Sequence, residues 1–312
     1  MKTGRGTRLI AVLLLALAAT GCGHALSQPM PDMKGRLALK VVREQPSKMN
    51  DMPIGVHQIP DTSVYVSGHQ GAAGVGALFG VIGLAVAHAA AQSTGESKTK
   101  DAQAALRVDI AAETERVLAE EIARLPESPR FATAGTPADG AVELAPFIVV
   151  NFIGEDQVRP WVVLMTRLKD GRGDEKWKTR YIASLAEPRP LTGDNGWASD
   201  DGALLRQALE DSLRAAIGVF LKDASGTLRP GTPRAVKVKG QWVWVKQPLE
   251  MRAKVLEETD ETIVVVPDVS DAIVFAGVNV LGKKWIVVTD DRAADESKPA
   301  FAPNNRRGTA PR

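Results

Sequence analysis

The chain has 312 residues, of which 44% are hydrophobic, with 39 lysines and arginines against 37 acidic residues. This length and apolar content are those of a globular protein with one large or two small domains. The near balance of charge lacks the basic field of a nucleic-acid-binding protein, so no nucleic-acid partner is expected.

The first segment is organised as an export signal. Lys2, Arg5 and Arg8 precede the apolar run Leu9–Ala19, and small residues lead to Cys22, the only cysteine. A basic start, a short apolar core and small residues before a cleavage point are typical of a secretory signal peptide, here residues 1–21. An uncleaved anchor, or an ordinary signal with a chance cysteine, are the alternatives, but the run is too short to span a bilayer as a resident helix.

The sequence ATGC at positions 19–22 resembles the lipobox of bacterial lipoproteins, with Ala19 where that family usually has leucine. The resemblance implies cleavage before Cys22 and acylation of its thiol and its new amino group. It also implies residence in the outer membrane, because Gly23 stands where aspartate commonly retains such proteins in the inner membrane. The expected partner is therefore the membrane, through a covalent lipid on Cys22, and no other cofactor is expected. Without the three cations of the signal, 36 basic residues face 37 acidic ones, a net charge of −1.

Residues 23–34 are polar and contain Pro29 and Pro31, which predicts a lipidated tether over residues 22–34. Residues 35–225 are predicted to form the main domain. Its first strands are expected at Arg36–Val42, where apolar residues alternate with polar or small ones, and at Thr62–Ser67.

The segment 71–92 is rich in glycine and alanine and is predicted to be a helix. Small residues recur at a spacing of four, which places each series on one helical face where two helices can approach closely. Membrane contact or helix-mediated assembly is one interpretation, and burial within the protomer is the other. The predicted helix interface consists of Ala72, Gly76, Gly80, Gly83 and Ala87.

The rest of the main domain predicts an α+β fold, an antiparallel sheet with helices packed on one side. Two helices and three strands are expected, with a hairpin at residues 170–174 that joins the last two strands. In chain order they are the helix Asp101–Leu125, the strands Phe147–Phe152, Trp161–Lys169 and Lys176–Leu185, and the helix Gly202–Asp223.

This order of elements over residues 36–223, together with the lipobox, is similar to small envelope-assembly lipoproteins of the curli-export and lipopolysaccharide-assembly families. The resemblance implies a non-enzymatic role in assembly or transport, with self or other envelope proteins as partners.

Residues 234–290 predict a second unit of short strands, a small all-β barrel or meander, and residues 291–312 predict a disordered tail. Trp242 and Trp244 share one face of an expected strand over Gln241–Lys246. Packing of that face in the core is one interpretation. The alternative is an exposed aromatic pair that contacts a sugar or a partner.

No catalytic or metal-binding motif stands out, so the chain is expected not to be an enzyme and to hold no metal. The four histidines lack metal-type spacing, and neither a nucleophile elbow nor a phosphate loop is present. Two main hypotheses follow: an outer-membrane lipoprotein for envelope assembly, export or scaffolding, or a monomeric cell-wall or polysaccharide-binding module that uses the C-terminal β unit. An enzyme whose site forms only in three dimensions is a third.

Overall fold

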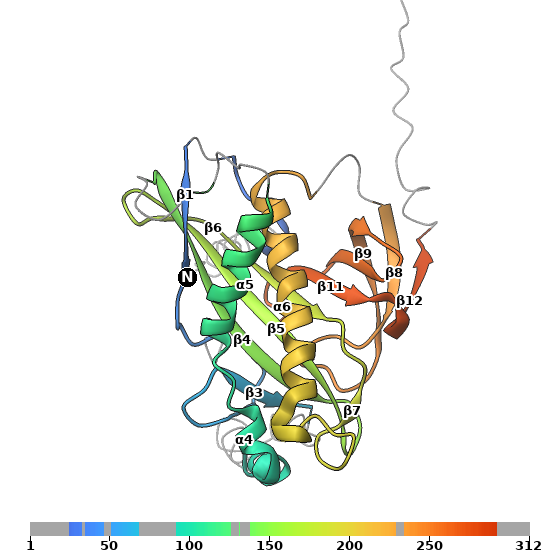
Figure 1. The fold of residues 1–312 in the computed structure, drawn as a ribbon. Helices are drawn as coiled ribbons and strands as arrows, with labels where there is room; N and C mark the ends of the chain where they lie inside the picture. The colour runs from blue at the N-terminus through green and yellow to red at the C-terminus, as the bar shows by residue number, and fades with distance from the viewer. Residues whose placement is uncertain are drawn as a thin grey trace, which may run out of the picture.

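The computed structural model describes residues 25–32, 35–46, 51–68, 92–125, 131, 138–228 and 234–291. The described strands belong to one sheet of twelve, and helices cover one of its faces (Figure 1). The predicted α+β class is confirmed. The sheet is mixed rather than antiparallel, because β1 and β3 both pair in parallel with β4 and β11 pairs in parallel with β6.

The strands are β1 (Leu37–Val41), β2 (His57–Gln58), β3 (Val64–Ser67), β4 (Gly140–Phe152), β5 (Gln157–Asp170), β6 (Glu175–Ser184), β7 (Arg189–Pro190), β8 (Arg234–Gly240), β9 (Leu249–Glu258), β10 (Thr262–Pro267), β11 (Val278–Gly282) and β12 (Ile286–Asp290). The α-helices are α4 (Gln103–Leu106), α5 (Ile110–Arg124) and α6 (Ala203–Ala224), and residues 92–99 are also helical. Short 3₁₀ turns lie at η1 (Ala25–Ser27), η3 (Lys100–Ala102), η4 (Asp200–Gly202) and η5 (Lys283–Trp285).

The centre of the sheet is the antiparallel trio β4, β5 and β6. Its apolar stretches are buried along both faces, which explains why they lack the alternation of a half-exposed strand. The predicted hairpin between β5 and β6 is confirmed: Asp170 Oδ1 accepts from the backbone N–H groups of Arg172 and Asp174, at 2.9 and 3.1 Å. Gly173, with φ +88°, supplies the left-handed backbone of this turn.

Two helices lie side by side over this trio (Figure 1). Helix α6 buries the apolar face that its periodicity predicted, which comprises Leu205, Leu209, Leu213, Ile217 and Phe220. The single helix predicted over Asp101–Leu125 is wrong, because residues 107–109 interrupt it. Asp109 caps α5 by accepting from Ala112 N at 3.1 Å, and an aspartate in this role favours a new helix start over a continuous helix.

The C-terminal strands continue the same sheet. β8, β9, β10 and β11 are successive antiparallel neighbours, β12 returns to pair with β8, and β11 joins β6. The barrel alternative is therefore wrong, since β12 and β11 pair with β8 and β6 rather than with each other. Strands on both sides of the boundary predicted between residues 225 and 234 share this sheet.

The face of the sheet opposite α5 and α6 carries a second apolar core. Side chains of β4, β5 and β6 on that face pack with side chains of β8–β11 and of the loops that join them. The described loop residues of this core are Met52, Val56, Trp242, Val243, Trp244 and Phe275. Both faces of the central strands are thus covered, one by helices and one by strands and loops.

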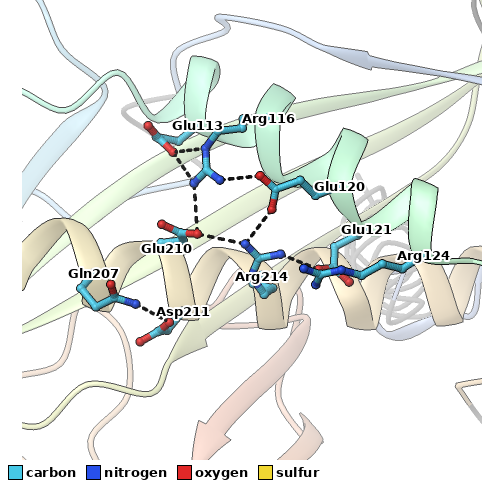
Figure 2. Close-up of polar contacts among 9 residues, drawn as sticks. All are labelled: Glu113, Arg116, Glu120, Glu121, Arg124, Gln207, Glu210, Asp211 and Arg214. Atoms are coloured by element: carbon cyan, nitrogen blue, oxygen red, sulfur yellow. Dashed lines mark hydrogen bonds and ion pairs between the residues drawn. The ribbon is translucent and has the colours of Figure 1, made fainter.

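A charge network joins α5 to α6 on the outer side of the helical layer (Figure 2). Arg116 on α5 binds Glu113, Glu120 and Glu210 at 2.8, 2.6 and 3.1 Å. Arg214 on α6 binds Glu120, Glu121 and Glu210 at 2.9, 2.7 and 2.9 Å. Glu120 and Glu210 each bridge both arginines, so the network ties the two helices together.

This network predicts a loss of stability in acid. Hydrogen bonds from Arg214 and Arg116 lower the pKa of Glu120 and Glu210 below their ordinary value of 4.5. A carboxylate with a lowered pKa in the folded state stabilises the fold above pH 4.5, and this contribution disappears as the pH falls through the lowered value. We expect the melting temperature of wild type to exceed that of Arg116→Gln/Arg214→Gln at pH 7 and to match it in strong acid.

Thermal unfolding followed by circular dichroism across this pH range tests the expectation. Because these side chains are solvent-accessible, high salt should reduce the difference at pH 7. A difference in melting temperature that stayed constant from neutral to acid pH would contradict the role given to the glutamates.

Candidate functional site: the docked N-terminal segment

Most residues singled out in the sequence lie outside the described residues. These are Cys22 and the predicted helix interface, with Ala72, Gly76, Gly80, Gly83 and Ala87. The signal peptide and residues 292–312 of the predicted tail lie outside them as well. The described residues nearest to the predicted anchor are residues 25–32.

Residues 25–32 of the predicted tether are docked on the body of the protein. Leu26 and Met30 are buried. Trp177 Nε1 of β6 donates to the carbonyl of Gln28 at 3.0 Å, and the Thr179 hydroxyl donates to the carbonyl of Leu26. The sequence gave no sign of this docking, because Leu26 and Met30 stand among prolines and polar residues and form no periodic pattern.

The loop between β10 and β11 also binds this segment. Leu26 N donates to Asp271 Oδ1 at 3.3 Å, and Asp271 belongs to the loop that leads into β11. Gly277 closes that loop with φ +125°, and a Cβ there would lie 2.6 Å from the carbonyl oxygen of Arg180. Only glycine fits this approach, so the loop is held directly against β6.

Arg180 of β6 fixes the loops on the other face of the same strand. Its Nη2 binds Asp51 Oδ1 at 2.8 Å, with the two side chains 8% and 16% exposed. Its Nη1 lies 3.5 Å from the carbonyl oxygens of Ile273 and Val274. One strand thus holds the N-terminal segment on one face and two loops on the other, a cluster that nothing in the sequence indicated.

This docking places the folded body close to the predicted anchor. Three residues separate Cys22 from Leu26. Four residues of fully extended chain span at most about 14 Å. The Cα of Leu26, which is held by Thr179 and Asp271, therefore lies at most about 14 Å from the Cα of Cys22.

The prediction of Trp242 and Trp244 as an exposed ligand contact is wrong. Trp242 is 0% and Trp244 6% exposed. Residues 241–248 form a turn rather than the expected strand, and Trp244 has φ +69°. Trp242 packs on Phe275 with ring centroids 5.7 Å apart, and Trp244 packs on Phe147 at 6.2 Å. Both rings belong to the second core. This agrees with the other interpretation of the sequence, in which the two tryptophans pack in the core.

Arg159 is a buried charge that the sequence gave no means of finding, because it lies within the long strand β5. Burial lowers its pKa to about 10. Its Nε donates to Ser184 Oγ at 2.9 Å and its Nη2 to the Ser184 carbonyl at 3.1 Å, while its guanidinium stacks 5.0 Å from the Trp161 ring. These contacts join β5 to β6 and give Arg159 a structural role.

Two open polar clefts, of about 370 and 380 Å³, lie elsewhere on the surface. The first borders the start of α5, where Arg43 forms a bidentate ion pair with Asp109 at 2.8 and 2.9 Å. The second is crossed by Lys98, whose Nζ donates to the Glu155 carbonyl at 2.7 Å. Among the described residues, no group of three or more histidine, cysteine or acidic side chains is placed to hold a metal ion.

Within the described part of the chain, no helix has the length and apolar character needed to cross a membrane. Comparisons with protein-family models, with curated proteins and with solved structures each found no match to this chain.

Proposed function

We propose that this protein is a lipoprotein of the bacterial outer membrane that acts without catalysis in envelope assembly, export or scaffolding. The lipobox-like sequence before Cys22 supports the anchor, and the docking of Leu26 carries the proposal. A body fixed within about 14 Å of its acyl chains works at the membrane surface and does not reach far from it.

The proposed partners follow from the same arrangement. The membrane binds through the lipid on Cys22. A second copy, or another envelope protein, binds through the small-residue face of segment 71–92. The cell-wall-binding alternative has lost its aromatic contact, since Trp242 and Trp244 are buried.

The anchor is tested by expressing the wild type and Cys22→Ser in a bacterial host. We expect wild type in the outer-membrane fraction, with an N-terminal peptide that begins at an acylated Cys22. We expect Cys22→Ser without acyl chains and outside the membrane pellet after a salt wash. His24→Ser, two positions away, is the matched control and should behave as wild type. A wild-type peptide that carried no acyl chain would refute the lipoprotein.

The assembly role is tested on the same lipidated protein in mild detergent, with its mass measured by light scattering. We expect a defined oligomer that Gly76→Ile/Gly80→Ile disrupts, because the added side chains separate closely packed helices. Val75→Ile, in the same segment but off the small-residue face, should leave the mass unchanged. A monomeric wild type would refute assembly through this segment.

A further inference from the structure

The part of the sheet formed by β12, β8 and β9 has a solvent-exposed face that carries several lysines. The outer face of β12, β8 and β9 exposes Lys237, Lys239 and Lys254, while Val236 and Val238 point into the core. Lys237 stands directly opposite Arg252 in the β8–β9 register. Like charges opposite one another on neighbouring strands destabilise a sheet unless counter-ions are near. Arg252 has such a counter-ion in Asp291, whereas no carboxylate among the described residues forms an ion pair with Lys237.

The carboxylates near this face balance its positive charge only in part. Arg252 Nε binds Asp291 Oδ2 at 2.5 Å, which neutralises the arginine. Glu250 lies opposite Lys239, and Asp268 lies near Arg252. Among the described residues, no carboxylate forms an ion pair with Lys237, Lys239 or Lys254, whereas most other strand lysines have one. An apolar side chain completes the face: Val287 on β12, opposite Lys239, is 60% exposed.

The basic face is connected to the docked segment by a short path. Asp268 N donates to the Arg252 carbonyl at 2.9 Å, and Asp271 in the same loop accepts from Leu26 N. Three residues of chain span at most about 11 Å. The first half of β9, which contains Arg252, therefore lies near Leu26, where the chain departs toward Cys22.

We propose that the outer face of β12, β8 and β9 binds the anionic surface of a lipid bilayer, with the three lysines on lipid phosphates and Val287 at the headgroup boundary. Charge complementarity and the short path to Leu26 favour a bilayer over a soluble polymer. The assignment of the bilayer as the one that holds Cys22 rests on the proposed function. The binding itself does not require the lipid.

The test uses residues 22–312 carrying Cys22→Ser, so that neither the predicted signal peptide nor an acyl chain contributes. Binding is measured by sedimentation with vesicles of phosphatidylcholine, with and without phosphatidylglycerol. Each lysine near an anionic surface contributes about fivefold in affinity, so Lys237→Gln/Lys239→Gln/Lys254→Gln should bind the anionic vesicles about 100-fold more weakly. High salt should abolish the wild-type binding.

The matched control removes the same charge elsewhere, with Lys40→Gln/Lys100→Gln/Arg107→Gln, all exposed and on other elements. It should retain the affinity of the parent chain. Equal binding by the two triple variants, or binding independent of phosphatidylglycerol, would overturn the proposal. A soluble anionic polysaccharide that displaced the protein from the vesicles at a concentration below that of the anionic lipid would also overturn the proposal. It would assign the face to a polymer. Because the tested variant cannot be acylated, these outcomes do not depend on whether Cys22 of the wild type is acylated.

Discussion

Replacement of Trp242 by alanine should destabilise the protein by about 3–5 kcal/mol, as for large aromatic side chains removed from well-packed cores. The Trp242 ring is fully buried and packs on Phe275. Its Nε1 donates to the Leu249 carbonyl at 3.2 Å, so the substitution also leaves the start of β9 without that hydrogen bond. Equilibrium unfolding in urea measures the change in the free energy of unfolding.

Trp285→Ala is the matched control. This tryptophan precedes Ile286, the β12 partner of Gly240, but it is only partly buried and is covered by Lys284. Trp285→Ala should lower the free energy of unfolding clearly less than Trp242→Ala does. A Trp242→Ala protein as stable as wild type would show that the ring is not packed as described, and it would reopen the ligand-contact interpretation.

Replacement of Arg180 by methionine should destabilise the protein by about 3 kcal/mol, because it removes the guanidinium that the largely buried Asp51 binds. Asp51→Asn in the Arg180→Met background should restore part of that stability, since the amide is easier to bury than the carboxylate. A double-mutant cycle with Asp51→Asn, Arg180→Met and the double variant isolates the coupling between the two side chains.

The chain offers a control in the exposed ion pair of Arg43 and Asp109, whose side chains are 66% and 53% exposed. Although that pair is bidentate, its coupling should stay below about 1 kcal/mol because water screens it. Equal coupling energies for the two pairs would contradict the burial assigned to Arg180 and Asp51.

The elements with strong local signals could be predicted from the sequence. The apolar face of α6 repeats from Leu205 to Phe220, and the glycines and aspartates at 170–174 specify the turn between β5 and β6. In both cases the pattern lies within one element or one hairpin, where neighbours in sequence are neighbours in space.

The errors arose where a distant contact decides the conformation. The alternation over residues 241–246 imitates a strand, yet these residues turn so that Trp242 and Trp244 both enter the second core. The docked segment itself depends on Thr179 and Asp271, which are far away in the chain.

The parallel pairing of β11 with β6 has a consequence for how the chain acquires its fold. Val278–Leu281 supplies the neighbour of Tyr181–Ser184, and the whole of α6 and the β8–β10 meander is made between them. Until those last residues emerge, the central hairpin presents an open edge of unpaired backbone groups and apolar side chains, a ready template for aggregation. Contacts so remote in sequence also form slowly. A nascent chain of this protein should therefore depend on a holding chaperone until its final strands are complete.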